Sequence, residues 1–320
     1  MINGMFVGHW VGATALGAIN VASPYVSLIY SFSLIFGVGG STVVAIYLGK
    51  SEKRKASQVF TSDTIVLTAL SLIITIMAFA FSNKLARLLG ATPENIEYVK
   101  DYLQVITLGS GFFILDYFGA VIIKTDGYPA LAMVANTLAV AVEILLMVIL
   151  VKFLGMGIKG VGIALATAQA VVVITLLYHF IFRKSTLKFI KTGIDFKEFK
   201  WIIPIGIPDA ISEGSSGIMV LIFNYIIYAA LGEEGIVAFS VLSYLNLLLV
   251  QVILGVSQGI QPLISYNYGR TDKKTYMLYL KYGLAFAFIF SFIIFIACQV
   301  FTRPIIGLFI DENEIRIIDI

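Results

Sequence analysis

Two acidic residues, Asp209 and Glu213, stand four positions apart in a long apolar stretch. Side chains at this spacing share one face of a helix. Two like charges in a low-dielectric setting repel each other, so one carboxyl should hold a proton or both should share a cation. Pro204 and Pro208 remove backbone donors nearby, and the carbonyls that they free are suitable Na⁺ ligands. The pattern predicts a proton or cation site without a fixed metal, where Na⁺ is one ligand that Glu213 could take.

Three more acids lie within apolar segments of the chain. A charge at the middle of a bilayer costs about 2.5–3.5 kcal/mol on insertion scales, so such residues are candidates for ion coupling. Asp116, which has no basic residue near it in its segment, and Glu143 are the stronger two. The alternative for Glu143 is a carboxyl buried as its neutral acid in a helix contact. Asp63 lies near the start of its segment, and we expect it to reach the interface or to bond nearby backbone.

Polar side chains within the apolar segments are candidates for a substrate cavity. Gln258 and Gln261 stand three positions apart and can face one cavity of a helical bundle. Hydrogen bonding between helices would explain any one of these polar residues equally well. The remaining candidates are Asn136, Asn224, Tyr266 and Asn267.

The composition indicates a protein that spans a membrane. Apolar residues make up 59% of the 320 residues and charged residues only 13%, against about 45–50% and 25% in average proteins. The single cysteine excludes a disulfide framework, and no metal-ligand spacing or catalytic motif appears. We therefore expect no enzyme and no cofactor. The expected partners are the lipid bilayer and small molecules, with no nucleic acid and no obligate protein partner.

Charge and turn signals divide the chain into membrane-spanning helices of roughly 20 residues or more. Lys and Arg gather in alternate loops, and positive loops stay in the cytoplasm, so the chain enters from the cytoplasmic side. The polar segment 183–200 is a basic connector between a first lobe, 1–182, and a second lobe, 201–320. The predicted helices cover 1–8 (in part), 15–48, 57–81, 94–123, 129–153, 158–182, 199–231, 236–268 and 274–301, with a tenth beginning at the end.

An internal repeat relates the two lobes. Residues 39–54 correspond to 259–274, and in both copies an uncharged helix closes with an aromatic residue, a glycine and a basic residue before a charged turn. Internal repeats are typical of secondary transporters, which bind substrate between related halves. Projecting one copy onto the other predicts that part of the first helix and the last helices of a complete protein are absent from this chain.

Six segments, taken in order, resemble the multidrug and toxic compound extrusion (MATE) transporters. The most specific reads GVSQGIQPLISYNYG, at the end of the eighth predicted helix. The others lie at the first helix junction, in the second helix, in the turns before the fifth and sixth helices, and in the seventh helix. They are residues 6–16, 37–50, 126–129, 155–162 and 205–213.

This resemblance implies an all-α polytopic fold of two pseudo-symmetric six-helix lobes. It also implies a secondary antiporter that exports lipophilic, often cationic drugs or toxins in exchange for Na⁺ or H⁺ across the plasma (inner) membrane. Glu213 matches a glutamate that takes part in cation binding in the family. Asn3 stands where many relatives have an ion-binding Asp, so Glu143, with Asp116, becomes the first-lobe candidate. The alternatives are a flippase for lipids or lipid-linked oligosaccharides, and a truncated fragment without activity.

Overall fold

The computed structural model describes residues 6–7, 10–91, 95–182, 185–191 and 193–300, and these residues lie in helices or in the segments that join them. The chain forms two compact units, Met1–Gly214 and Ser215–Ile320. Most of the partial helix expected at 1–8, and all of the tenth helix expected at the end, lie outside the described residues. The division into lobes at the connector 183–200 stays a prediction.

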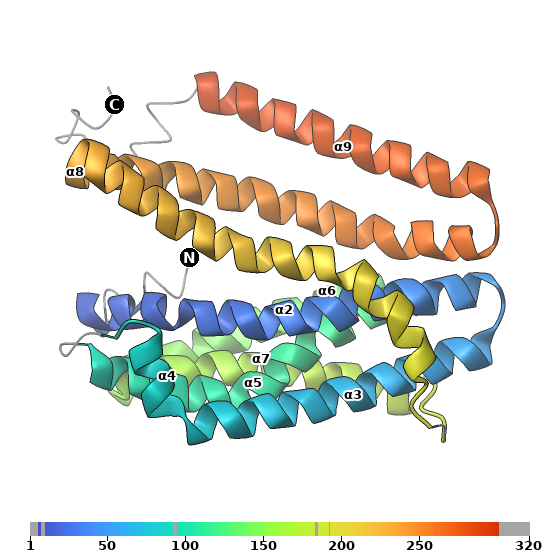
Figure 1. Cartoon of the computed structure of the whole chain (residues 1–320), viewed down its shortest axis with the longest axis horizontal. Helices are drawn as coiled ribbons and strands as arrows, with labels where there is room; N and C mark the ends of the chain where they lie inside the picture. Colours follow the sequence, from blue (N-terminus) through green and yellow to red (C-terminus); the bar gives the residue numbers. More distant parts are fainter. Residues whose placement is uncertain (1–5, 8–9, 92–94, 183–184, 192, 301–320) are drawn as a thin grey trace. The chain divides into compact units, whose positions relative to one another are not determined.

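Long helices build the first unit (Figure 1), and their ends lie within a few residues of the predicted ones except where stated below. They are α2 (Ala13–Gly49), α3 (Lys53–Ala80), α4 (Ser82–Leu88), α5 (Ile96–Thr125), α6 (Pro129–Met147), η1 (Val148–Phe153), α7 (Gly157–Phe182) and the first turns of α8 (Phe196–Gly269).

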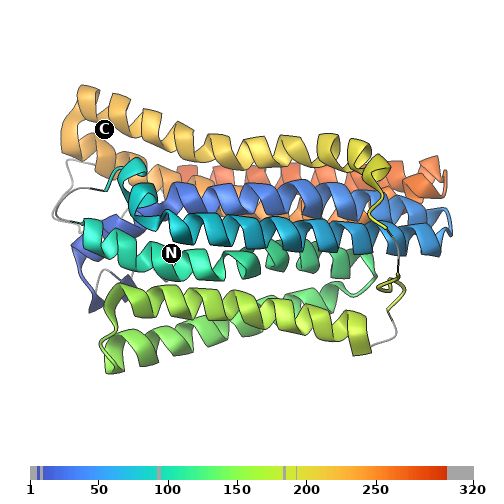
Figure 2. The same ribbon diagram turned by 60° about the horizontal axis from the view of Figure 1, so that its bottom comes forward.

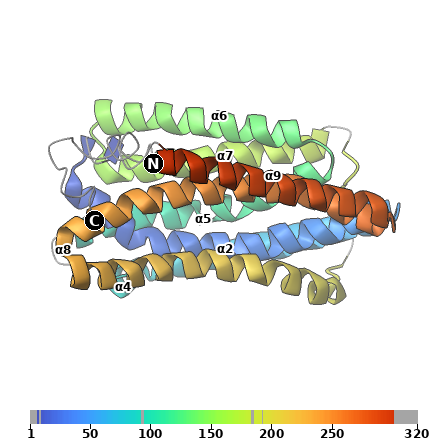
Figure 3. The ribbon, with the colours of Figure 1, turned by 90° about the horizontal axis from the view of Figure 1, so that it is seen from above.

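Helix α5 is the centre of this unit and contacts α2, α3, α4, α6 and α7. Figure 3 shows the order α6, α7, α5 and α2 across the unit, and Figure 2 shows the green α6 and α7 on the opposite side of α5 from the blue α2. Glycines let α5 and α7 approach closely: a Cβ at Gly109 would lie 2.7 Å from Ala166 Cβ, and one at Gly162 would lie 3.0 Å from Val105 Cβ. Such small residues are how apolar helices pack where lipid removes the hydrophobic driving force.

Two local features were not predicted. The short helix α4 turns back after α3 (Figure 1). The last six residues of the predicted helix 129–153 form the π-helix η1. An apolar run such as this one carries no signal for a π-helical turn, because its hydrogen-bond register depends on neighbouring packing.

The second unit contains the rest of α8 and α9 (Lys273–Val300). Two helices, 199–231 and 236–268, were predicted here, but the helical backbone continues from Phe196 to Gly269, so the predicted break is wrong. The ribbon of α8 nevertheless reverses its direction, and its last limb runs beside α9 (Figure 1). Gly232 and Gly235 mark the expected turn, and glycine allows a helix to bend sharply.

The internal repeat is visible in the backbone. Helices α2 and α8 end 220 residues apart, and so do the beginnings of α3 and α9. In the two turns, Ser51 and Thr271 both have positive φ, 63° and 59°. One residue further, the N–H groups of Glu52 and Asp272 each donate to the carbonyl five residues earlier, at 2.9 and 3.0 Å. Both copies thus end in the same helix-capping turn.

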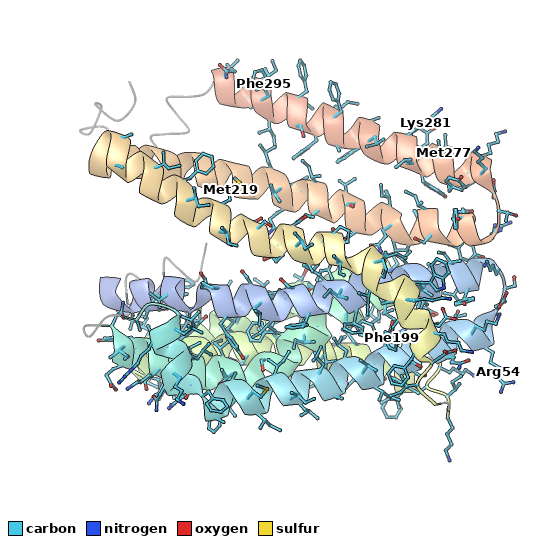
Figure 4. All side chains as sticks on the ribbon, viewed as in Figure 1. Arg54, Phe199, Met219, Met277, Lys281 and Phe295 are labelled. Atoms are coloured by element: carbon cyan, nitrogen blue, oxygen red, sulfur yellow. The ribbon has the colours of Figure 1, made fainter. Side chains whose placement is uncertain are left out.

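Seven helical segments among the described residues are long and apolar enough to cross a membrane. Large apolar side chains cover the outer faces of α3 and α9; Ile76 is 66% exposed and Phe288 73% exposed. Figure 4 shows the labelled Met277 and Phe295 projecting from α9. These exposed faces are the surfaces that a lipid bilayer would cover.

Candidate cation-coupling site

The first turns of α8 lie against α2 through one glycine of each helix. A Cβ at Gly39 would lie against the carbonyl oxygen of Ile202, and a Cβ at Gly206 would lie against the carbonyl oxygen of Ile35. The two backbones therefore touch at two points. This contact places the part of α8 that bears Asp209 beside α2.

Side chains fix the same contact. Phe199, labelled in Figure 4, is buried and meets the ring of Phe36 edge to face at 5.9 Å. The hydroxyl of Ser31 lies 3.3 Å from the carbonyl oxygen of Ala210 and 2.9 Å from that of Ser27 in its own helix, and these two oxygens compete for its one proton. Because Ala210 directly follows Asp209, this contact places the acid-bearing part of α8 beside α2.

Tyr30 of α2 is the residue on which three of the predicted coupling acids act electrostatically. The acids are Asp116, Glu143 and Glu213, which belong to α5, α6 and α8. The ring of Tyr30 packs edge to face against Phe113 at 6.1 Å. The charges of acids separated by up to 97 positions in the sequence, from 116 to 213, therefore act on one tyrosine.

The fourth acid, Asp209, joins the group through Tyr117 of α5. The charges of Asp209 and Glu213 both act on Tyr117, and both acids are half-buried. The Tyr117 ring covers Gly37, where a Cβ would lie 2.8 Å from ring carbon Cδ1. Sequence analysis did not identify Tyr30 or Tyr117, because a tyrosine in an apolar helix usually indicates packing alone.

Asp116 is buried, with 8% of its surface exposed, and its Oδ1 has no hydrogen-bond partner. The sequence suggested that no basic residue lay near it, which is wrong. Lys124 lies two turns later on the same helix, and the two charges act on each other. Residues eight positions apart do not look like neighbours in a sequence. A helix nevertheless brings Asp116 and Lys124 back to the same side after two turns.

Asp63 differs from its expectation. Instead of reaching the interface or bonding backbone, its carboxyl is fully buried, at 0% exposure, and neither oxygen has a hydrogen-bond partner. Oδ2 lies against the backbone of α2 at Gly40. Sequence position near the start of α3 could not reveal this burial, because α2 and the start of α8 cover that part of the helix.

Two of the predicted cavity amides bond to their own helices. Asn136 Nδ2 donates to the carbonyl of Ala132 at 2.9 Å, and Asn267 Nδ2 donates to the carbonyl of Leu263 at 2.8 Å. Asn136 is exposed, whereas Asn267 is buried. Each amide keeps one N–H and its oxygen for other contacts.

The other predicted cavity residues belong to the second unit. Tyr266 is 40% exposed, and the guanidinium of Arg270 lies 6.0 Å from its ring centre. Gln258 and Gln261 are half-buried and have interactions of their own. The side chain of Asn224 lies outside the described residues.

These features define a class of protein: a polytopic membrane protein built from apolar helices, with acidic residues placed within those helices. Among the described residues, no group of three or more His, Cys, Asp or Glu side chains could hold a metal ion. The chain belongs to the MatE family, whose sequence model matches residues 1–149 and 214–319. The expected all-α, MATE-type fold is thereby confirmed.

Relatives with assigned names share this fold and cover most of the chain. The multidrug export protein MepA of Staphylococcus haemolyticus (strain JCSC1435) is 26% identical over 84% of this chain. MepA of Staphylococcus aureus (strain MRSA252) is 27% identical over 98% of the chain and 70% of its own length. The chain spans 60% of the length of the S. haemolyticus relative.

A solved structure gives the same result for the fold. The outward-facing conformation of a multidrug resistance MATE family transporter of the MOP superfamily superimposes with a TM-score of 0.90 at 24% identity. The match covers 96% of this chain and 70% of that one. At this identity the likeness describes the fold alone.

Proposed function

We propose that the protein is a secondary active multidrug antiporter that exports lipophilic, often cationic compounds in exchange for Na⁺ or H⁺. The relatives named multidrug export proteins support the substrate class. The observation that carries the coupling role is the convergence of Asp116, Glu143 and Glu213 on Tyr30. Buried acids inside a membrane bundle are costly and mark ion pathways.

The coupling mechanism follows from electrostatics. Several carboxylates in a low-dielectric region repel one another, and one bound cation or proton relieves that repulsion. In this proposal the cation favours the arrangement in which α8 is seated on α2 at Gly39 and Gly206. Loss of the cation favours the alternative arrangement, because a ligand can shift a conformational equilibrium only toward the state that it binds better.

We place the protein in the plasma membrane with its N-terminal side in the cytoplasm, as the distribution of Lys and Arg predicts. The substrate cavity is assigned to the polar residues identified above: Gln258, Gln261, Asn224, Asn136, Tyr266 and Asn267. The half-buried side chains of Gln258 and Gln261, three positions apart on α8, make these two the residues to test first.

The test measures ethidium accumulation in cells that express the whole reading frame. Wild-type protein should lower accumulation, and Glu213→Gln should abolish the effect because the amide keeps the size but loses the charge. Glu97→Gln is the matched control, since Glu97 is an exposed acid that pairs with Lys100 at 3.4 Å. Undiminished efflux by Glu213→Gln, at equal amounts in the membrane, would refute the coupling role. If the protein scrambled lipids in reconstituted vesicles but did not export drugs, the result would favour the flippase instead.

A further inference from the structure

The carboxyl of Asp63 is a buried titratable group outside the cluster around Tyr30. It is fully buried, and neither of its oxygens has a hydrogen-bond partner. An isolated carboxylate without partners is expensive to bury, and it usually takes up a proton instead. Something other than hydrogen bonding must therefore account for an acid at this position.

Packing alone does not require an acid here, because the second copy of the internal repeat forms the equivalent helix contact without one. In the first copy Asp63 of α3 lies against Gly40 of α2. The positions 220 residues later are Gly283 of α9 and Ile260 of α8, and a Cβ at Gly283 would lie against the Ile260 side chain. One large and one small residue fill the contact in both copies, but the large one is an isoleucine in the second copy and an acid in the first.

A second acid lies beside Asp63. The charge of Glu198, in the first turn of α8, acts on Asp63. Glu198 Oε1 accepts a hydrogen bond from the Tyr47 hydroxyl at 2.9 Å, whereas its Oε2 is buried without a partner. Tyr47 lies two turns after Gly40 on α2, so the two acids approach α2 along one face.

No other described charge acts measurably on Asp63. The groups on the surrounding elements interact with Glu198, with Tyr47 or with each other. On the far side of Tyr47, Lys55 pairs with Glu52 at 2.6 Å. On α5, Asp116 and Lys124 act on each other. The acidic charges that act on Tyr47 come from Glu198, Glu52 and Asp195. The ammonium groups of Lys50 and Lys55 lie over its ring, 5.8 and 5.5 Å from the ring centre.

We propose that Asp63 is a proton-binding site that shares one negative charge with Glu198, at the junction of α2, α3 and the first turn of α8. The proton moves between bulk water and an Asp63 carboxyl oxygen, and no other bond forms or breaks. With the proton bound, Asp63 is neutral and the junction carries only the charge of Glu198. With the proton released, the charge of Asp63, which no hydrogen bond compensates, repels the charge of Glu198, and the start of α8 is driven from α2 and α3.

The segment before α8 would transmit this change. The backbone N–H of Asp195 donates to the Ser62 hydroxyl, next to Asp63, at 3.4 Å. Two more bonds join the same segment to α3, from Ile190 N–H to Thr61 at 3.3 Å and from Lys188 N–H to Ser57 at 3.2 Å. The proton site thus lies where the connector between the predicted lobes is attached. The proposal is independent of which ion drives transport at Glu213.

The experiment uses the whole protein in lipid nanodiscs and follows the infrared band of protonated carboxyl groups as the pH is raised. In the wild type we expect a component of this band that persists at neutral pH, and subtracting the spectrum of Asp63→Asn should isolate it from the bands of the other buried acids. Glu198→Gln should keep this component but make it disappear at lower pH, because a neutral neighbour makes Asp63 easier to ionise. Glu97→Gln, at an exposed acid, is the control and should leave the band unchanged.

A second variant guards against misfolding. The pair Gly40→Ile with Asp63→Gly copies the contact of the second half, so it retains the packing and removes only the carboxyl. We expect this double variant to fold and to lose the Asp63 component of the band. A band in the double variant as strong as in the wild type, or an Asp63 component that responds to added Na⁺ but not to pH, would overturn the proposal.

Discussion

The contact between Gly39 and α8 allows a sharp prediction, because the neighbouring atom is backbone and cannot turn away. A methyl group in Gly39→Ala would lie against the carbonyl oxygen of Ile202. Overpacking of this kind typically costs about 1–3 kcal/mol. Replacing glycine by alanine within a helix stabilises the folded protein by about 1 kcal/mol, because alanine has the higher helix propensity. The variant should therefore lose up to about 2 kcal/mol of stability.

Gly111→Ala on α5 is the matched control. Its new methyl group would meet the Ser71 hydroxyl oxygen at 3.6 Å, which is an ordinary van der Waals distance. It should gain up to about 1 kcal/mol from helix propensity alone. Both variants would be compared with the wild type by thermal unfolding of the protein in nanodiscs. Equal melting temperatures for the two variants would show that α8 is not seated on α2 as described, and that the reasoning on this contact is wrong.

Two further predictions concern the turns that hold the helices. Asp126 accepts hydrogen bonds from Ser185 Oγ at 2.8 Å and from the Leu187 N–H at 3.2 Å, and its Oδ2 lies 2.9 Å from His179 Nε2. Asp126→Ala should cost at least about 2 kcal/mol, since it leaves these buried donors unpaired. Limited proteolysis should then cut the connector faster. In the second unit, hydrogen bonds from Thr275, its side chain first and then its backbone N–H, lower the pKa of Asp272 below the ordinary value of 3.8. A lowered folded-state pKa adds stability above the ordinary value, and that stability is lost as the pH falls through the lowered pKa. Thr275→Val should make melting less dependent on pH in that acidic window.

Controls separate these effects from general damage. Asp101→Ala removes a partly exposed acid that pairs with Lys159 at 3.1 Å, and it should change neither melting nor connector cleavage appreciably. If Asp126→Ala melted and was cleaved like Asp101→Ala, the hydrogen bonds around Asp126 would not contribute to stability. An unchanged acid dependence of melting in Thr275→Val would mean that the hydroxyl does not hold the Asp272 charge.

The sequence by itself determined the helices, the membrane class and the repeat, because these depend on local patterns. Long uncharged stretches set the positions of the spans. The repeated glycine, aromatic and basic residues located two identical capping turns, which Ser51 and Thr271 confirm in their backbone angles. The family followed from ordered motifs of the same local kind.

The local patterns did not reveal every element. The break expected near Gly232 is absent from the helical backbone of α8, and η1 has no sequence signal of its own. Both depend on how backbone hydrogen bonds adapt to packing. The periodicity of apolar residues shows only which residues share a face of a helix. It does not detect a change in the backbone hydrogen-bond register.

Only the tertiary structure decided which acids lie together. The charges of Glu143 and Glu213 both act on Tyr30, and no spacing along the chain encodes the lateral arrangement of their helices. The same holds for Asp63, which looked like an interfacial residue until α2 and α8 were seen to cover it. Burial and charge proximity arise between helices that are distant in sequence, so composition and periodicity could identify the acids but not the site they form.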